Sequence, residues 1–388
     1  MQKIGIALVG YKFMGRAHSN ALRQINAFMA PKVPVGCTVL CGQTPGPLRV
    51  AADEMGIAEI STDAFAAIAR DDVQAVDIVT PADAHSDLAL HAISLGKHVF
   101  CEKPLALDYP EAKRLLDAAR AAGVVHQVGF NYRFAPAVQL AKKLIEEGKL
   151  GEIRHFHGLY QQDYLVDESF PLVWRLQKKR CGYGAHGDLG AHLVDLARFL
   201  VGDIAEVVGN SRTFIKHRPI VESSVGLSSV ATDADTPMGE VDVNDAVSFL
   251  CNFQCGAMGM FESTRMAPGH KNGLVFEING SLGSLRFELE RINELWYFSR
   301  ADAPGEQGWR MIQVTESMHP YIDRWWPAGH VIGYEHTFTH ELYEFAQSIA
   351  NNRPAKPDFA DGAACCAVLD AVMDSVDSRG WEKVIQVD

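Results

Sequence analysis

Three residues of types that move protons stand out by their surroundings: Lys103, Asp188 and His192. Lys103 lies in the segment Glu102-Lys103-Pro104, directly after an apolar run, and Asp188 and His192 are one helical turn apart. A lysine, a carboxylate and an imidazole can together remove a proton from a hydroxyl group. We expect His192 to take the proton, because imidazole titrates nearest neutral pH, with Asp188 stabilising its charged form. The sequence leaves open whether Lys103 or His192 is the formal base.

Two regions with different patterns must position these residues. Up to residue 130, short apolar runs, the first at 4–9, alternate with helical patterns, which predicts strands in βα units and a parallel sheet. Beyond residue 150, alternating strands predict an open, largely antiparallel sheet interrupted by a helix at 188–201, with helices at about 333–350 and 359–378 closing the chain. We therefore predict an α/β protein with two domains, 1–130 and 131–388. The Ser, Gly, Asp and Pro content of residues 217–241 predicts a long surface loop.

The first apolar run ends in a turn that opens a helix, where a dinucleotide-binding fingerprint belongs. The motif is incomplete because Lys12 replaces its middle glycine between Gly10 and Gly15. Backbone amides near Lys12, Phe13 and Met14 can still bind a pyrophosphate at the helix N-terminus. An ordinary strand-to-helix turn is the alternative reading.

The second apolar run indicates which dinucleotide would bind. It ends at Gly42-Gln43-Thr44, without the acid that normally binds the adenosine ribose and without an arginine. The choice between NAD and NADP is therefore open, and we favour NAD. Thr80 and Pro81 follow a third apolar run, in the crevice where open α/β sheets bind ligands. His85 either joins them in this cofactor site or is a surface histidine at a helix start.

In the order VGYKFMGRAH, DIVTP, CEKPLAL, GFNYRF, WRLQKK and GDLGAHLVDLARFLVG, these motifs resemble the Gfo/Idh/MocA oxidoreductases over essentially the whole chain. The resemblance implies an N-terminal Rossmann domain with a parallel sheet, and a C-terminal α/β domain that binds substrate and forms oligomers. It implies a nicotinamide cofactor and a homodimer or homotetramer. It also implies that Lys103 is the catalytic lysine, Asp188 and His192 the acid–histidine pair, and Glu102 a ribose-binding carboxylate. Trp174 and Arg175 resemble a family element that contacts the dinucleotide.

Several other polar residues are candidates for binding. Asn131 and Tyr132 lie near the expected domain boundary and could reach the nicotinamide or a sugar, although packing is an alternative for Tyr132. Tyr160, Gln161 and Asp163 follow a strand and could bind sugar hydroxyls. We expect no metal site, because His155 and His157 share a strand face without a third ligand spaced with them.

Composition limits the partners of the chain. A net charge of −12 argues against nucleic acid and anionic membranes, but allows a neutral small substrate. The eight scattered cysteines form no CxxC pair, and no apolar run is long enough for a signal peptide or a membrane helix, which predicts a cytoplasmic protein.

These observations predict an NAD(P)-dependent oxidoreductase that transfers hydride between the nicotinamide and a ring CH–OH of a sugar, glycoside or cyclitol. One alternative is an NAD-dependent glycosidase that oxidises C3 transiently and then eliminates the aglycone. It would need a second base, for which Tyr132 and Asp195 are candidates. Another is a non-catalytic nucleotide sensor, against which the set Lys103, Asp188 and His192 argues.

Overall fold

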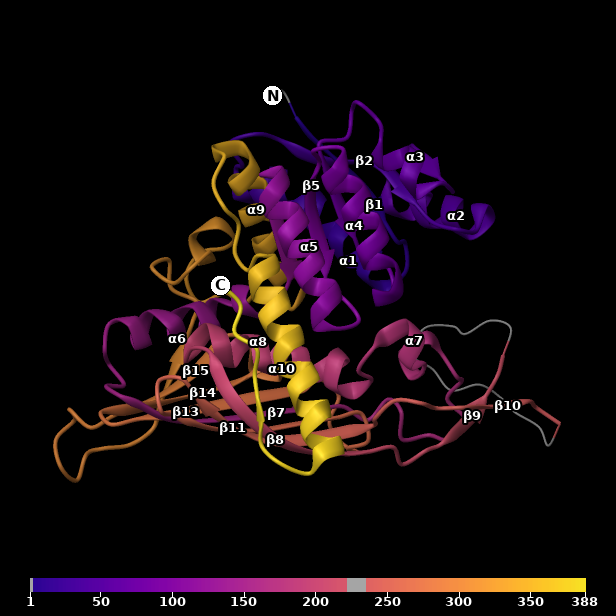
Figure 1. Cartoon of the computed structure of the whole chain (residues 1–388). Coiled ribbons are helices and arrows are strands. Elements are labelled where there is room, and N and C mark those ends of the chain that lie inside the picture. Colours follow the sequence, from indigo (N-terminus) through magenta and orange to yellow (C-terminus); the bar gives the residue numbers. More distant parts are fainter. Residues whose placement is uncertain (1–2, 222–234) are drawn as a thin grey trace. The chain divides into compact units, whose positions relative to one another are not determined.

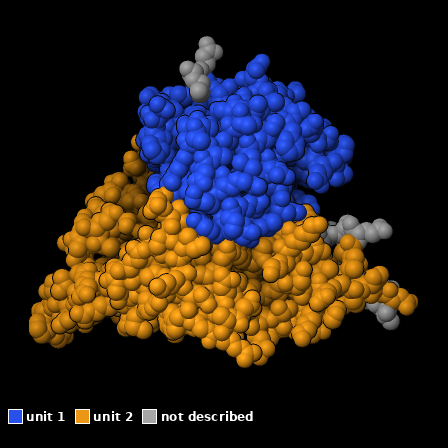
Figure 2. All heavy atoms as spheres, in the orientation of Figure 1, with its two compact units in different colours: residues 1–134, 333–363 blue, residues 135–332, 364–388 orange. Residues whose placement is uncertain are grey.

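The computed structural model describes residues 3–221 and 235–388. The chain divides into two compact units, drawn in blue and orange in Figure 2. Unit 1 comprises residues 1–134 and 333–363, and unit 2 comprises residues 135–332 and 364–388. The return of residues 333–363 to unit 1 differs from the expected single boundary at residue 130.

Hydrogen bonds explain why this late segment belongs to unit 1. Helix α9 (Glu335–Asn351) packs beside helix α1 (Phe13–Gln24), as Figure 1 shows. The side chain of Asn131 donates to Thr337 Oγ1 over 2.8 Å. Gln127 donates to the backbone carbonyl of Glu341 over 3.1 Å. A helix distant in sequence thus satisfies polar groups at the end of the Rossmann sheet.

Unit 1 is built on a six-stranded sheet with the order β3-β2-β1-β4-β5-β6 and parallel pairing throughout. This order is typical of dinucleotide-binding folds, in which ligands bind where the strand order reverses, here between β1 and β4. The strands are β1 Ile4–Val9, β2 Val35–Cys41, β3 Ile60–Ser61, β4 Ala75–Ile78, β5 His98–Glu102 and β6 His126–Gly129. Besides α1 and α9, the α-helices are α2 Pro45–Met55, α3 Ala64–Ile68, α4 His85–Ser94 and α5 Tyr109–Ala122.

Unit 2 contains a nine-stranded sheet, which is antiparallel except between β7 and β12 among the described strands. Helix α8 (Ala191–Leu200) covers one face, where Leu193 approaches the backbone of Gly158. The rings of Phe156, Phe249 and Phe261 stack in the core of the sheet. The strands are β7 Ile153–Gln161, β8 Ile204–Arg212, β11 Ala246–Phe253, β12 Met258–Thr264, β13 Gly273–Gly280, β14 Gly283–Glu288, β15 Glu294–Ser299, β16 Arg310–Gln313 and β17 Glu382–Lys383.

Of the remaining helices, the sequence predicted one and missed others. The predicted helix at 359–378 is confirmed as α10 (Phe359–Ser378). Helix α6 (Pro136–Glu146), the short helix α7 (Lys178–Cys181) and helix α2 are additional elements. Both α2 and α6 have proline at their N-terminal end, where a missing N–H costs little. In the sequence alone, these prolines suggest a loop and not the start of a helix.

The loop predicted for residues 217–241 is wrong at its two ends. Strand β9 (His217–Pro219) pairs antiparallel with β10 (Met238–Glu240) in a small second sheet. Residues 222–234, inside the predicted loop, lie outside the described part of the chain. Within residues 3–221 and 235–388, no helix is long and apolar enough to cross a membrane.

Candidate active site

The turn between β1 and α1 has the geometry of an anion-binding turn despite its missing glycine. Gly10 has a φ of 120°, and a Cβ there would lie 2.9 Å from the carbonyl oxygen of Val79. A Cβ on Gly15 would lie 2.3 Å from the carbonyl oxygen of Gly10. Lys12 has a φ of −79°, which any residue adopts, so the middle position does not need glycine. The single departure from the motif, at Lys12, is thus at a position whose backbone conformation tolerates any residue.

The start of helix α1 is suited to a phosphate group. Its first turn contains no acidic residue, and Lys12 at the N-cap makes no side-chain cap hydrogen bond. The free amides and the helix dipole favour an anion at this position. Phe13 is exposed beside them, and Met14 packs against the neighbouring apolar cluster. Residues 10–15 could therefore hold the pyrophosphate of a dinucleotide.

The end of β2 explains which residue could face the ribose. A Cβ on Gly42 would lie 2.3 Å from the ring of Tyr11, so this position admits only glycine while that ring stays in place. Gln43 and Thr44 are exposed directly after it. The acid that the fingerprint normally carries could consequently not stand at Gly42 without moving Tyr11. The exposed side chains of Gln43 and Thr44 are the ones of this segment that a ligand could reach.

The crevice after β4 contains Thr80, Pro81 and the buried ring of His85. The hydroxyl oxygen of Thr80 is buried and has no hydrogen-bond partner among the described residues. His85 has its Nδ1 3.0 Å from the carbonyl oxygen of Pro104 and its Nε2 3.0 Å from that of Thr80. His85 is therefore not the surface histidine that was one reading of the sequence. It links the loops after β4 and β5.

Glu102 is the last residue of β5 and is almost completely buried, and Lys103 follows it directly. One oxygen of its carboxylate, Oε2, accepts the backbone N–H of Lys103 over 3.0 Å. The other, Oε1, lies 3.2 Å from Nε2 of His18. The Lys103–Pro104 peptide bond is cis. Lys103 itself is half-buried, so its ammonium group can approach a ligand from a fixed backbone.

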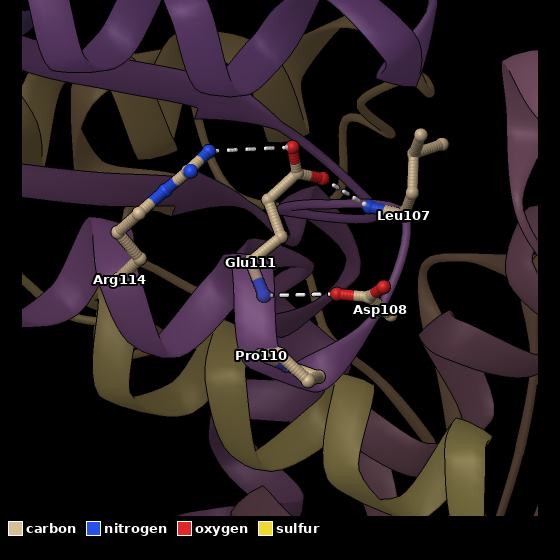
Figure 3. Close-up of a pocket in the computed structure, with 5 residues that line it drawn as sticks. All are labelled: Leu107, Asp108, Pro110, Glu111 and Arg114. Carbon is tan, nitrogen blue, oxygen red and sulfur yellow. Dashed lines mark hydrogen bonds and ion pairs between the residues drawn. The ribbon is translucent and has the colours of Figure 1, made fainter.

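The loop after Lys103 is secured at the start of α5 (Figure 3). Asp108 caps the helix by accepting the backbone N–H of Glu111 over 2.8 Å. The carboxylate of Glu111 accepts the backbone N–H of Leu107 over 3.0 Å and lies 3.8 Å from the guanidinium of Arg114. These residues and Pro110 line a small pocket. Reciprocal capping of this kind stabilises a helix start, so both ends of the loop that carries Lys103 are held.

Asn131 and Tyr132 lie in a short 3-10 helix, Asn131–Phe134, at the end of unit 1's first segment. Asn131 uses its amide nitrogen on helix α9, as described above. Tyr132 is 3% exposed, and its ring contacts that of Tyr334. The ring of Tyr132 is thus held by packing. Packing was the alternative to ligand binding that the sequence left open for this residue.

In unit 2, Asp188 lies in a π-helical turn, His186–Gly190, that runs directly into α8. It is therefore inside a continuous helix and is not the N-cap. Its Oδ2 accepts a hydrogen bond from the hydroxyl of Tyr164 over 3.1 Å. The same oxygen lies 4.0 Å from Arg175 Nε and 3.9 Å from a terminal nitrogen of Arg265. Asp188 is thus a carboxylate between two guanidinium groups.

The partners of Asp188 are themselves fixed. Arg265 is fully buried and donates to the carbonyl oxygens of Asn244 and Arg175 over 3.0 and 3.2 Å. Burial, together with the charge of Asp188, raises the pKa of Tyr164 to about 12. The phenol therefore stays protonated at neutral pH and donates to the carboxylate. Arg175 also stacks on Trp174, with its guanidinium carbon 4.4 Å from the ring centroid.

His192 lies one turn further along, on the side of α8 that faces β7. Its ring meets the ring of Tyr160 edge-on, with 6.0 Å between the centroids. Tyr160 donates to the side-chain oxygen of Asn272 over 2.7 Å, and Gln162 donates to the same oxygen over 2.8 Å. Tyr160 and Asn272 thus place polar groups beside the imidazole.

Two other residues expected to bind substrate are engaged elsewhere. Gln161 alternates with Tyr160 along β7, so it points to the other face of the sheet, where it donates to Glu262 over 2.8 Å. Asp163 accepts from Lys271 over 2.7 Å, and this hydrogen bond lowers the pKa of its carboxyl group. The structure therefore brings Tyr160 and His192 together in unit 2, but leaves Gln161 apart from them.

Sequence reasoning missed four residues of these clusters: His18, Tyr164, Arg265 and Asn272. His18 was within the quoted fingerprint, so an inward-facing imidazole was the available signal. Tyr164 and Arg265 follow the ends of β7 and β12 and carry no local pattern, because only the folded sheet brings them to Asp188.

Comparisons with known proteins agree with this description. Residues 4–130 match the oxidoreductase family with an NAD-binding Rossmann fold, and residues 138–286 match the GFO/IDH/MocA C-terminal domain. Levoglucosan dehydrogenase of Pseudarthrobacter phenanthrenivorans is 38% identical over 390 residues, with 100% of both chains covered. The scyllo-inositol 2-dehydrogenase (NAD(+)) of Bacillus subtilis is 31% identical over 287 residues, covering 73% of each chain.

Solved structures extend the agreement over the full length. A levoglucosan dehydrogenase in complex with NADH superposes with a TM-score of 0.94 at 37% identity, with 100% of both chains covered. An oxidoreductase domain protein from Kribbella flavida gives a TM-score of 0.94 at 44% identity, with the same coverage. The parallel Rossmann sheet, the large and mostly antiparallel sheet, and these full-length similarities place the chain in the Gfo/Idh/MocA family of NAD-binding oxidoreductases.

Proposed function

We propose that the protein is an NAD(P)-dependent dehydrogenase that oxidises a ring CH–OH of a sugar, glycoside or cyclitol, or catalyses the reverse reduction. The observation that carries the proposal is the placement of Asp188 between Arg175 and Arg265, one turn before His192. Such a fixed negative charge suits an imidazole that becomes positive when it accepts a proton. Full-length relatives named levoglucosan dehydrogenase support a sugar substrate.

Residues of unit 1 fit a dinucleotide. In the proposal, the turn at 10–15 binds the pyrophosphate and Gln43 faces the adenosine ribose. The buried hydroxyl of Thr80 and the carboxylate of Glu102 bind the remaining part of the dinucleotide. Pro81 shapes the same crevice. When bound, the oxidised nicotinamide supplies the hydride acceptor. NAD is favoured because a relative of full length binds NADH.

The protein's own groups handle the proton. His192 accepts it from the reacting hydroxyl, and Asp188 stabilises the imidazolium without itself changing charge, because two guanidinium groups and Tyr164 stabilise its ionised form. Lys103 is the second group to which we assign a role in proton transfer, as a hydrogen-bond donor that polarises a substrate oxygen. Tyr160 and Asn272 are placed to bind a neighbouring hydroxyl of the sugar.

An NAD-dependent glycosidase is the alternative function. It needs a second base that reaches C2 of the sugar, in addition to the groups that handle the hydroxyl proton. Lys103, Asp188 and His192 already meet the proton requirement of a dehydrogenase, and the ring of Tyr132, one candidate for the second base, packs against that of Tyr334. We therefore propose the simple dehydrogenase. The eight free cysteines are consistent with the reducing cytoplasm, where we propose that it acts.

Replacing Lys103 by alanine tests its catalytic role. We expect Lys103→Ala to lower kcat by roughly 10²- to 10⁴-fold, the usual contribution of one proton-transfer group. NADH affinity, measured by fluorescence titration, should stay within several-fold. Lys113→Ala is the matched control, because Lys113 pairs with Asp117 on the exposed surface of α5. Wild-type kcat in Lys103→Ala would refute the assignment.

The ratio of products to cofactor separates the two candidate functions. A dehydrogenase accumulates one equivalent of NADH, seen at 340 nm, for each keto-sugar formed, and leaves glycosidic bonds intact. A C3-oxidising glycosidase instead recycles its cofactor, cleaves many glycosides per NAD and incorporates solvent deuterium at C2. We expect the first result with a panel of sugars and glycosides. Deuterium at C2 with catalytic NAD, detected by NMR in D₂O, would establish the second.

Gln43 is the position at which to test cofactor choice. We expect Gln43→Asp to weaken NADP binding by repelling its 2′-phosphate, and Gln43→Arg to strengthen it, with little change in NAD affinity. Gly42→Asp is a poorer test, because its side chain would overlap Tyr11 and disturb the turn. Titration of both cofactors against the two Gln43 variants measures the effect. Equal NADP affinity in both variants would show that this side chain does not face the ribose.

We also propose that the protein forms a homodimer or homotetramer through the sheet face opposite α8. Leu250, Met260 and His157 are directly paired across β11, β12 and β7, and all three are exposed. Contiguous exposed apolar side chains on a sheet indicate an interface. Met260→Glu should lower the mass measured by light scattering, whereas Val50→Glu, on exposed apolar surface of α2, should not. A monomeric wild type would contradict this proposal.

A further inference from the structure

Behind Glu102, unit 1 buries a cluster of four ionisable side chains, of which the proposed function uses only Glu102. His18 of α1, Asp77 of β4 and Glu341 of α9 are each 0% exposed, and Glu102 is 4% exposed. Nδ1 of His18 lies 3.0 Å from both carboxylate oxygens of Asp77. Nε2 of the same ring lies 3.2 Å from Oε1 of Glu102. One imidazole therefore lies between two carboxylates.

The number of protons on the His18 ring decides how many of these contacts can be hydrogen bonds. A neutral imidazole has one N–H, so one of its nitrogens would turn a lone pair toward a carboxylate oxygen. A doubly protonated ring donates to both carboxylates. Glu341 adds a third acid, since one ligand atom each from His18, Glu102 and Glu341 lie within 4.8 Å of one another. The side chains that face His18 from β4, β5 and α9 are thus three acids, with the apolar rings of Phe100 and Phe338.

Electrostatics agree with that count. Burial opposes a charge on His18, but Asp77 and Glu102 outweigh it and raise the pKa of the imidazole well above its ordinary value. Burial likewise raises the pKa of Asp77, although His18 opposes this shift. Both shifts favour retention of protons by the cluster. Two other fully buried histidines behave oppositely, because burial lowers the pKa of His186 and of His340 to about 3.

The cluster is connected to the backbone that carries Lys103. Glu102 uses Oε1 on His18 and Oε2 on the backbone N–H of Lys103, so both of its carboxylate oxygens are held. Gly129 makes room for this carboxylate, because a Cβ there would lie 2.7 Å from Oε1. A rotation of Glu102 would break the contact to Lys103. Whatever holds His18 therefore also limits the movement of the lysine.

We propose that His18 is a buried imidazolium, oriented by Asp77, that acts as a positioning residue: it holds Glu102 and thereby fixes Lys103 and the carboxylate that faces the dinucleotide. This inference rests on the proposed function for the part that concerns Lys103. His18 does not touch the reacting atoms in it. The charge of His18 offsets one carboxylate of the cluster, so the dinucleotide meets a carboxylate that is rigid and accepts hydrogen bonds.

NMR of the full-length protein labelled with ¹⁵N-histidine tests the protonation state. We expect both ring nitrogens of His18 to be protonated at pH 7, whereas His186 and His340 should give neutral rings in the same spectrum. The His18 signals are assigned by their loss in His18→Gln, or by their shift in Asp77→Asn if the first variant does not fold. A neutral His18 ring at pH 7 would overturn the proposal. This measurement needs no substrate, so it is independent of the proposed reaction.

Binding and turnover test the positioning role. Asp77→Asn keeps the size of the side chain and one acceptor but removes a charge, so we expect NADH to bind several-fold more weakly and kcat to fall about 10-fold. His340→Gln is the matched control, since it alters another fully buried histidine and should change neither value more than twofold. Wild-type NADH affinity in both Asp77→Asn and His18→Gln would overturn the proposal. So would loss of NADH affinity on treatment of the wild type with EDTA, which would indicate a metal ion in the cluster.

If no sugar is oxidised but NADH affinity falls in Asp77→Asn, the proposed function fails while the role of His18 in holding Glu102 stands. If sugar oxidation is confirmed and the NADH affinity of Asp77→Asn is unchanged, the proposed function stands and the role of His18 fails. The two proposals are therefore separable.

Discussion

The candidate residues of each unit depend on one constraint: a charged side chain must be held in place where little water can stabilise it. In unit 2 the fully buried guanidinium of Arg265 has Asp188 as a near anion, at 3.9 Å. Removing one partner of a fully buried ion pair costs about 3–5 kcal/mol. The cost is smaller here, because the side chain of Asp188 is 22% exposed. Even so, Asp188 contributes to stability, and a loss of activity on its removal would combine this effect with the proposed effect on His192.

In unit 1 the carboxylate of Glu102 is held by an imidazole, that of His18, instead of a guanidinium group. Glu102 is nearly buried and has the imidazole of His18 on one oxygen and a backbone amide on the other. The choice of histidine is physically reasonable, because a planar ring with N–H groups on opposite sides can bridge two acids at once. In both units, an acid near the expected chemistry is held by groups that do not themselves react. Such supporting contacts reduce the reorganisation that a proton transfer would otherwise need.

Much of the fold was predictable because hydrophobic periodicity is a local signal. The strand at 4–9 and the helix at 359–378 have the bounds expected from the sequence. The return of α9 to unit 1 was not predictable, since it depends on partners such as Asn131 and Thr337, which are 206 residues apart. The pairing of β9 with β10 was hidden for a similar reason: turn-forming residues dominate the segment between them. Local composition reports a turn, whereas pairing depends on the whole sheet.

The candidate residues likewise fall into those that a local motif indicates and those that depend on the folded sheet. Lys103, Asp188 and His192 could be proposed from the sequence, because the segments that contain them are continuous motifs. Tyr164 and Arg265 could not, because they follow the ends of β7 and β12, and only the folded sheet brings them to Asp188. Lys12 illustrates how a motif can mislead. Its departure from glycine weakened the fingerprint in the sequence, yet its φ of −79° shows that the backbone never required glycine there, while Gly10, at 120°, does. The fold of the turn therefore requires glycine at Gly10, because of its φ, and at Gly15, where a Cβ would lie 2.3 Å from the carbonyl oxygen of Gly10. The middle glycine of the fingerprint lets the backbone approach a pyrophosphate closely, so Lys12 bears on the approach of the ligand and not on the fold of the turn.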